Sequence, residues 1–330
     1  MNSQKEIKWA VIGAGNVCEI KSAPAMSALR GSQIKTVMRR NAEKAADYAQ
    51  RHNIPNWTTD ANDILNDPEI TAIYIATPPD THASYTALAA KAGKAVYVEK
   101  PMANTYAECL SMIEVCKKHQ VPLFVAYYRR TLPGFLKVKE IIESNVLGAI
   151  RCVSIEMFQP MQPALIAQAE TNWRVKPEIA GGGYFHDLAS HQLDYLDFVF
   201  GSVVEAKGIS GNQAGQYPAD DIVTASFKFE SGVIGSGIWC FTTDQNTEKD
   251  EIKIVGSKGQ LSFNTFGDPM IIKIKTGESE QELRYSHKQP IQTPLIQMII
   301  DHLNGNGTCV STGETAAKTT LIMEQIVGRK

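Results

Sequence analysis

Short apolar runs alternate with amphipathic stretches over the first part of the chain. The apolar runs cover residues 7–12, 34–38, 72–76, 95–98 and 123–126. They are rich in β-branched residues and show no helical period, which is typical of buried strands. The stretches between them predict helices up to about residue 29 and over 42–51, 81–91 and 103–119. Pro24 is expected to kink the first helix or to begin a new turn. This alternation predicts an α/β fold with a doubly wound parallel sheet of the Rossmann type.

After residue 125 the pattern changes to strands that follow one another through Gly and Asp turns. Strands are predicted at 150–157, 203–209, 221–229, 232–240, 251–256, 259–264 and 270–275, and helices at 135–144, 294–303 and 313–327. Ser231-Gly232 and Ser257-Lys258-Gly259 are typical of hairpin turns. The 330 residues are enough for two domains. We therefore predict a Rossmann domain over 1–125 and an α+β domain over 126–330 with a large, open, mostly antiparallel sheet.

Composition and charge exclude several classes of protein. Hydrophobic residues make up 43% of the chain and charged residues 21%, as in ordinary globular proteins. The net charge of -2 lacks the basic surplus of most nucleic-acid-binding proteins. No run reaches the ~18 apolar residues needed to span a membrane. The N-terminus has no signal-peptide pattern and the six cysteines form no C-x-x-C pair, so we expect a cytoplasmic protein with reduced thiols.

A glycine-rich turn follows the first predicted strand and begins the first predicted helix. It reads Gly13-Ala14-Gly15-Asn16-Val17-Cys18. The first glycine permits a tight turn, and the second lets a pyrophosphate approach the backbone at the start of the helix. The third small residue of this motif is replaced by Cys18, which could loosen the start of the helix. The position of the turn between strand and helix predicts a dinucleotide site.

The second strand ends in Arg39-Arg40, where an enzyme specific for NAD carries an acidic residue that binds the ribose 2′-hydroxyl. Two guanidinium groups can instead bind a 2′-phosphate. The sequence therefore favours NADP as the cofactor, with NAD as the alternative. An ordinary solvated basic pair is the non-functional interpretation.

Two further loops follow predicted strands, at the edge where ligands bind in parallel sheets. Thr77-Pro78 and His82 follow the third strand. A packing or capping role for His82 is favoured, with a catalytic role as the alternative. Glu99-Lys100-Pro101 follows the next strand. A lysine held there can hydrogen-bond a substrate oxygen during hydride transfer, and the proline is compatible with a cis bond.

The second domain carries a glycine triplet, Gly181 to Gly183, followed by His186, Asp187, His191 and Asp194. Asp187 and His191 are four residues apart and are expected on one helix face, where a carboxylate can tune an imidazole for proton transfer. These residue types also bind metals, but His186 is expected off that face, and no metal site is predicted. A helix cap with a buried polar pair is the structural alternative.

The order of these motifs, G-x-G, T-P-P-x-x-H, E-K-P and G-G-G-x-x-x-D-x-x-x-H-x-x-D, resembles the glucose-fructose oxidoreductase/inositol dehydrogenase (Gfo/Idh/MocA) family across nearly the whole chain. The resemblance implies that Lys100 is the catalytic lysine, that His191 is the acid/base, and that Asp187 positions substrate and supports that histidine. It implies cofactor contacts by Gly13, Gly15, Asn16, Val17, Arg39, Arg40, Thr77, Pro78, His82, Glu99, Trp173 and Arg174. A substrate contact by Tyr128 is a further expectation.

The resemblance implies an NAD(P)-dependent oxidoreductase, NADP preferred, acting on a sugar-like or polyol hydroxyl or carbonyl. Two alternatives stay open: a non-sugar substrate (a dihydrodiol, an imine or a tetrapyrrole), or a non-catalytic NADP-sensing regulator. Substrate specificity is expected to depend on loops 159–173 and 244–250. Family members commonly pair their C-terminal sheets, so a homodimer or homotetramer is expected.

Overall fold

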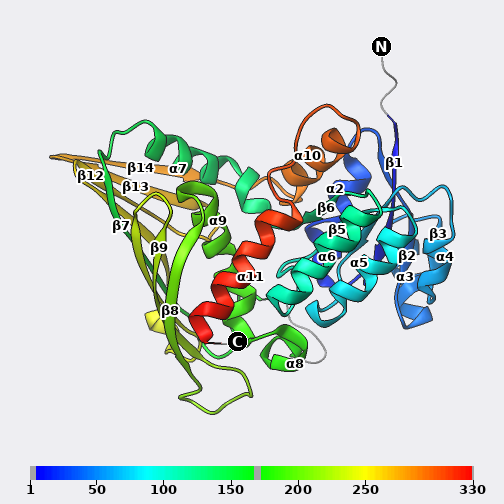
Figure 1. Ribbon diagram of the computed structural model, residues 1–330, viewed down its shortest axis with the longest axis horizontal. Helices are drawn as coiled ribbons and strands as arrows, with labels where there is room; N and C mark the ends of the chain where they lie inside the picture. Colours follow the sequence, from blue (N-terminus) through cyan, green and yellow to red (C-terminus); the bar gives the residue numbers. More distant parts are fainter. Residues whose placement is uncertain (1–4, 167–171, 329–330) are drawn as a thin grey trace. The chain divides into compact units, whose positions relative to one another are not determined.

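The computed structural model describes residues 5–166 and 172–328, which form two compact units (Figure 1). Unit 1 contains residues 5–128 and 288–317, and unit 2 contains 129–287 and 318–328. The segment 288–317 thus belongs to the same unit as the parallel sheet, although the sequence analysis grouped it with the second domain. Among the described residues, no helix is long and apolar enough to cross a membrane.

Unit 1 is built on a six-stranded parallel sheet with the order β3-β2-β1-β4-β5-β6. Its strands are β1 (Ile7–Ile12), β2 (Ser32–Met38), β3 (Asn56–Thr58), β4 (Ala72–Ile75), β5 (Ala95–Val98) and β6 (Leu123–Val125). Its helices are α1 (Asn16–Ile20), α2 (Ala23–Ala28), α3 (Ala42–Arg51), α4 (Ala61–Leu65), α5 (His82–Lys91), α6 (Tyr106–Lys118) and α10 (Thr293–Leu303). This is the strand order of a dinucleotide-binding Rossmann sheet.

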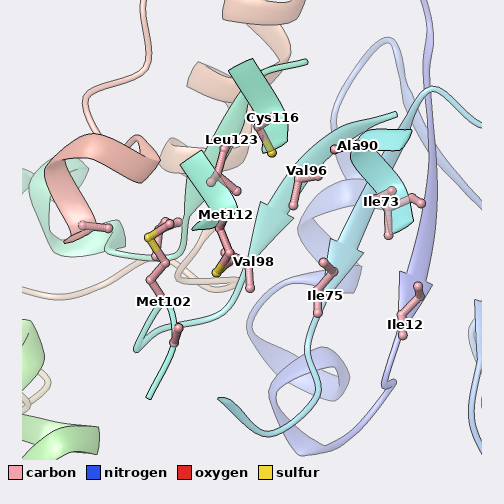
Figure 2. Packing of buried hydrophobic residues seen from close by; sticks show 14 of the residues in the cluster. Ile12, Ile73, Ile75, Ala90, Val96, Val98, Met102, Met112, Cys116 and Leu123 are labelled. Atoms are coloured by element: carbon pink, nitrogen blue, oxygen red, sulfur yellow. The ribbon is translucent and has the colours of Figure 1, made fainter. Parts of the chain in front are cut away.

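The two faces of this sheet bury different side chains. On one face Ile73, Ile75, Val96 and Val98 pack with residues of α4, α5 and α6 in a continuous apolar cluster (Figure 2). The opposite face is aromatic: the ring centroids of Tyr74 and Tyr97 are 4.9 Å apart. Both faces are covered, which explains why these strands are apolar without alternation.

Unit 2 contains an eight-stranded sheet with the order β14-β13-β12-β11-β7-β10-β9-β8, antiparallel except for the pair β7 and β10. The strands are β7 (Ile150–Phe158), β8 (Val203–Gly211), β9 (Ile222–Phe229), β10 (Ile234–Cys240), β11 (Lys249–Gly256), β12 (Gly259–Phe263), β13 (Met270–Thr276) and β14 (Ser279–Tyr285). Its helices are α7 (Pro133–Glu143), α8 (Pro177–Ala180), α9 (Ser190–Phe200) and residues 318–327 of α11 (Gly313–Val327). In Figure 1, α7 and α9 lie along the same side of the sheet.

The fold class predicted from the sequence is confirmed, and the differences from the predicted elements have local causes. The first helix is divided into α1 and α2, with Pro24 in the first turn of α2. Helix α6 begins three residues later than predicted, because Thr105 and Glu108 form a capping box. Strands β3 and β14 and helix α4 were not predicted. Strand β14 is a mostly polar strand at the edge of its sheet, so it carries no alternating apolar signal.

Candidate functional site

The loop after β1 is open where a dinucleotide is expected. Gly13 has a φ of +89°, and a Cβ there would come within 2.6 Å of the Thr77 side chain, so this turn requires glycine. Gly15 has no such restriction, because its Cβ would meet nothing closer than Gly13 O at 3.9 Å. Among the described residues, packing therefore leaves room beside the Gly15 Cα. This room lies at the carboxyl end of β1, where the strand order reverses, which is where dinucleotides bind in sheets of this order.

The residues that follow begin α1, with Asn16 exposed and Val17 partly exposed. Cys18 is fully buried, with its Sγ 3.9 Å from Gly13 O. The Tyr48 hydroxyl of α3 donates a hydrogen bond to Cys18 O over 3.0 Å. Burial raises the pKa of the Cys18 thiol to about 12, which keeps it neutral. The thiol is accommodated in the packing, so the expected loosening of the helix start is not seen.

Arg39 and Arg40 directly follow β2. The Arg39 backbone N–H donates to Thr58 O over 3.2 Å, which continues the pairing of β2 with β3. Arg39 is half-buried and Arg40 is exposed. Burial raises the pKa of Asp80, in the loop after β4, and the nearby charge of Arg40 partly offsets this rise. Both arginines therefore lie at the carboxyl edge of the parallel sheet.

The loops after β4 and β5 are held together by His82. Its Nε2 lies 2.8 Å from Thr77 O, and its Nδ1 lies 3.2 Å from both Pro101 O and Met102 O. The side chain has no exposed surface, and burial lowers the pKa of the imidazole. His82 therefore packs between the two loops inside the unit, where the neutral ring can donate its one N–H to a carbonyl of either loop. Thr77 and Pro78, in the loop after β4, are half-buried.

Glu99-Lys100-Pro101 forms the turn at the carboxyl end of β5, with a cis bond between Lys100 and Pro101. Glu99 is buried, and its Oε2 accepts a hydrogen bond from the Lys100 backbone N–H over 3.2 Å. Its Oε1 accepts from the Tyr74 hydroxyl over 2.6 Å. Lys100 itself is half-buried. The turn thus presents an amine at the same edge of the sheet as the Gly13–Gly15 loop.

In unit 2 the glycine triplet makes room for its neighbours. A Cβ on Gly182 would lie 2.2 Å from the His186 ring, and a Cβ on Gly183, where φ is +75°, would lie 2.6 Å from Ala219 Cβ. The ring Nδ1 of His186 lies 3.1 Å from Gly182 O. Phe185–Ala189 is a π-helix that leads into α9, where the sequence predicted an ordinary helix. Such turns inside helices are frequent at functional sites.

Asp187 lies in this π-helix and is paired with Arg174. The Arg174 Nε donates to Asp187 Oδ2 over 3.0 Å, and both side chains are mostly buried. The guanidinium carbon of Arg174 lies 4.4 Å from the Trp173 ring centroid. The predicted Trp173-Arg174 pair and Asp187 are therefore brought together. The specificity loop 159–173 falls partly outside the described residues, at 167–171.

His191 lies in the first turn of α9 and is almost fully buried. Its ring is 5.8 Å from that of Phe266, edge to face. The adjacent Gln192 donates to Thr265 Oγ1 over 3.2 Å and accepts from the Trp239 indole over 2.7 Å. These bonds attach α9 to the sheet and to the loop that carries Phe266.

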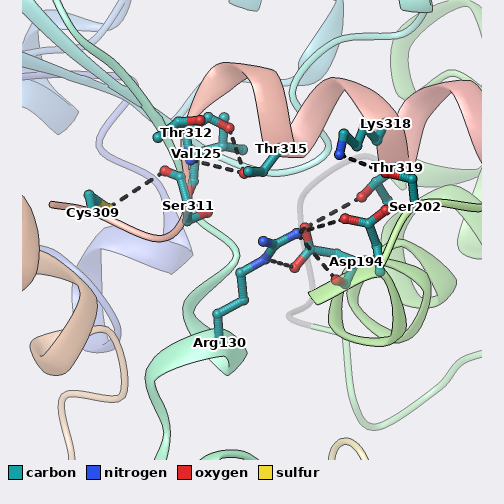
Figure 3. A network of polar contacts seen from close by, with 11 residues as sticks. Val125, Arg130, Asp194, Ser202, Cys309, Ser311, Thr312, Thr315, Lys318 and Thr319 are labelled. Atoms are coloured by element: carbon teal, nitrogen blue, oxygen red, sulfur yellow. Dashed lines mark hydrogen bonds and ion pairs between the residues drawn. The ribbon is translucent and has the colours of Figure 1, made fainter. Parts of the chain in front are cut away.

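The next turn of α9 carries a buried ion pair. Arg130 Nε and Nη2 each donate to the Asp194 carboxylate over 2.8 Å (Figure 3). Asp197 Oδ2 lies 3.6 Å from Arg130 Nη2. Burial raises the pKa of Asp194 to about 6, although Arg130 opposes the rise. Asp194 thus anchors α9 to Arg130. Among the described residues no group of three or more His, Cys, Asp or Glu is placed to hold a metal.

The candidate residues fall into two sets, one in each unit. Unit 1 holds the dinucleotide loop, Arg39, Arg40, Lys100 and the buried Tyr128, and unit 2 holds Trp173, Arg174, Asp187 and His191. Three features were not predicted from the sequence: Phe266, the Arg130–Asp194 pair, and Gln292, which donates a hydrogen bond to Glu99. A buried polar partner could have been expected from the sequence, because Tyr74 and Tyr97 lie inside buried strands and their hydroxyl groups require hydrogen-bond partners.

Comparison with known proteins agrees with this arrangement. Residues 7–127 match the family model described as "Oxidoreductase family, NAD-binding Rossmann fold", and residues 135–262 match the GFO/IDH/MocA C-terminal domain. A protein named oxidoreductase P35, from Formosa agariphila, is 38% identical over 325 residues, which cover 98% of this chain and 99% of that protein.

More distant proteins share the same architecture. The 1,5-anhydro-D-fructose reductase of Ensifer adhaerens is 26% identical over 312 residues, covering 93% of this chain and 91% of the relative. The crystal structure of aldose-aldose oxidoreductase from Caulobacter crescentus, complexed with glycerol, superposes with a TM-score of 0.86 at 21% identity. The superposition covers 98% of this chain and 97% of the Caulobacter crescentus chain. The chain therefore belongs to the GFO/IDH/MocA family of oxidoreductases.

Proposed function

We propose that this protein is an NADP(H)-dependent oxidoreductase that acts on a hydroxyl or carbonyl group of a sugar-like or polyol substrate. The observation that carries the proposal is the placement of the Gly13–Gly15 loop and the Lys100 turn at the carboxyl edge of one parallel sheet. Membership of the family supports it, as does the 1,5-anhydro-D-fructose reductase among the relatives. An amine at that edge is suited to hydrogen-bonding an oxygen that gains charge during reduction.

Residues of this chain fit the cofactor. The open space beside Gly15 would take the pyrophosphate, and Arg39 and Arg40 would bind a 2′-phosphate. When bound, the nicotinamide supplies or accepts a hydride. The absence of a carboxylate between Val37 and Arg40 supports NADP over NAD.

The remaining chemistry belongs to side chains. Lys100 would donate a hydrogen bond to the substrate oxygen and stabilise it as it becomes alkoxide-like. His191 would carry the proton to or from that oxygen, because imidazole exchanges protons near neutral pH. Asp187 is held by Arg174 and would orient the substrate by accepting hydrogen bonds from the hydroxyl groups of the substrate.

We also propose that the protein is a homodimer or homotetramer built through the open face of the unit 2 sheet. Ile234 and Ile209 are 58% and 78% exposed on that sheet. In β10, Ile234 and Ser236 alternate with Gly235, whose Cβ would collide with the buried Phe227 ring at 2.1 Å. The exposed residues of β10 therefore present apolar and small side chains to a second sheet.

We place the protein in the cytoplasm, in keeping with the reducing surroundings expected for its cysteines.

A substrate panel tests the proposed function. The purified protein is assayed at 340 nm with NADP and NADPH against aldoses, anhydrosugars, polyols and the matching ketoses, with Lys100→Ala as the background control. Turnover of at least one sugar-type compound by the wild type alone is expected. Turnover only of a dihydrodiol or an imine would replace the proposed substrate class with the alternative, and nucleotide binding without turnover of any compound would favour a regulator.

A further inference from the structure

The buried side chain of Gln292 connects a segment far along the chain to the turn that carries Lys100. Gln292 is fully buried and directly precedes α10 in unit 1. It occupies the N-cap position of α10, yet its side chain makes no capping hydrogen bond to that helix. The amide is therefore available for contacts with the parallel sheet.

Its orientation is determined by Tyr97 of β5 and by Glu99, in the turn that follows β5. The Tyr97 hydroxyl donates to Gln292 Oε1 over 2.7 Å, and Gln292 Nε2 lies 2.8 Å from Glu99 Oε1. Because the Tyr97 hydroxyl donates to the amide oxygen, the amide nitrogen is the atom that faces Glu99. Both ends of the amide are satisfied, so Gln292 has one favoured orientation.

Glu99 passes this constraint to Lys100. Its Oε1 accepts from both Gln292 and Tyr74, while its Oε2 accepts from the Lys100 backbone N–H over 3.2 Å. A carboxylate with both oxygens engaged cannot rotate without losing a hydrogen bond in a buried site, which is costly. The direction in which the chain leaves β5 into Lys100 is thus set by this group of side chains.

The backbone of Gln292 makes a second connection in the same unit. Its N–H donates to Lys21 O over 3.2 Å. Lys21 is the C-cap of α1, the helix that begins after Gly15. One residue therefore contacts both the helix after the dinucleotide loop and the carboxylate that holds the Lys100 turn.

We propose that Gln292 is a positioning residue, which fixes the Lys100 turn through Glu99 by its side chain and holds α1 by its backbone. Its consequence for catalysis rests on the proposed function, whereas its effect on the order of the turn does not. The two connections are separable, because substitution of the side chain leaves the hydrogen bond to Lys21 O in place. Such variants should lose turnover while keeping nucleotide affinity.

The test compares Gln292→Met and Gln292→Glu with the wild type and with Gln297→Met. Gln297 lies on α10 and donates to Asp301, so its replacement removes a similar hydrogen bond away from Glu99. Hydrogen–deuterium exchange of the peptide around Lys100 is measured on the whole protein, together with the Kd for NADPH and kcat. Thermal melting shows that each variant is folded.

We expect the Lys100 amide to exchange at least about 10-fold faster in Gln292→Met, with the amides of β5 unchanged. A kcat lowered about 10- to 100-fold with a Kd for NADPH within about threefold is also expected. The Gln292→Glu variant should recover turnover as the pH falls, because a proton shared with Glu99 restores the hydrogen bond. The Gln297→Met variant should behave as the wild type.

Unchanged exchange at Lys100 in both Gln292 variants would overturn the proposal, even if turnover falls. If the wild type turned over no sugar-type compound, the proposed function would fail, while the exchange measurement would still decide the role of Gln292. A pH-independent loss of turnover in Gln292→Glu equal to that in Gln292→Met would also count against a role through Glu99.

Discussion

Arg174 donates a hydrogen bond from its Nε to Asp187 Oδ2 over 3.0 Å while its guanidinium stacks on the ring of Trp173. This contact joins the segment at 172–175 to the π-helical turn that leads into α9. The sequence alone predicted that Asp187 supports His191, and it gave no partner for Arg174. The pairing shows that Arg174 fixes the carboxylate that we assign to substrate orientation.

Arg174→Ala is therefore expected to lower kcat/KM at least about 10-fold while changing Tm little, because both side chains keep some exposed surface (19% and 15%) and an ion pair that water still reaches contributes about 1 kcal/mol. Steady-state kinetics and a thermal melt measure both quantities. Lys139→Ala, which breaks an i,i+4 pair with Glu143 on α7, is the matched control and should leave kinetics unchanged. Equal kinetics for Arg174→Ala and the wild type would contradict the proposal that Arg174 and Asp187 take part in substrate orientation.

Lys100→Ala should lower kcat about 100- to 1000-fold, because the substrate oxygen loses the hydrogen bond that stabilises its developing charge. Nucleotide affinity should stay within about threefold of the wild type. Lys91→Ala, at the end of α5, removes an exposed lysine from the same unit and serves as the control. Full activity of Lys100→Ala would show that its role is wrongly assigned.

The Arg130–Asp194 pair predicts a pH dependence of stability. Burial raises the pKa of Asp194 from 3.8 to about 6. The folded state thus binds this proton more tightly than the unfolded state. Protonated Asp194 therefore contributes fully to the free energy of unfolding below about pH 4, and this contribution is lost as the pH rises through about 6. A shift of about two units corresponds to roughly 3 kcal/mol.

Urea unfolding at several pH values measures this effect. The stability of the wild type relative to Asp194→Asn should fall by roughly 2 kcal/mol between pH 4 and pH 7. Asp244→Asn replaces a carboxylate outside the ion pair and should show no such trend relative to the wild type. A pH-independent difference between the wild type and Asp194→Asn would mean that Asp194 is ionised throughout this range.

The open face of the unit 2 sheet gives a prediction about assembly. Ile234→Glu places a charge on β10, where we expect a second sheet to pack, and should shift the protein from two or four chains towards one. Light scattering after size-exclusion chromatography measures the mass. Leu88→Glu, on α5 of unit 1, is a comparably exposed control. A monomeric wild type would contradict the proposed assembly.

Much of the fold was predictable, because apolar strands and amphipathic helices leave a periodic signal. The Gly13 turn, the division of the first helix at Pro24 and the hairpin at Gly232 each depend on a residue with a specific backbone property. Strand β14 and the short strand β3 lack that signal, since one is mostly polar and the other has three residues. Elements of this kind are defined by their pairing partners and not by their own sequence.

The candidate site was predictable only where its residues form local motifs. Lys100 and His191 lie in recognisable sequence contexts, whereas Gln292 reaches Glu99 across 193 positions of the chain. The contact of His191 with Phe266 likewise depends on the strand order of the unit 2 sheet. The sequence did not predict the π-helix at Phe185–Ala189, whose wider turn changes the spacing on which the Asp187 and His191 prediction was based.

The central claim is that the chain binds NADP(H) for hydride transfer, and a titration with NADPH and NADH tests it most directly. Quenching of the tryptophan fluorescence is followed for the wild type, for Arg39→Ala/Arg40→Ala, and for Arg30→Ala, an exposed arginine before the opposite end of β2. We predict that NADPH binds at least about 10-fold more tightly than NADH, and that only the double variant abolishes this preference. Tighter binding of NADH would contradict the assignment of Arg39 and Arg40, and binding of neither nucleotide by cofactor-free protein would contradict the proposed oxidoreductase itself.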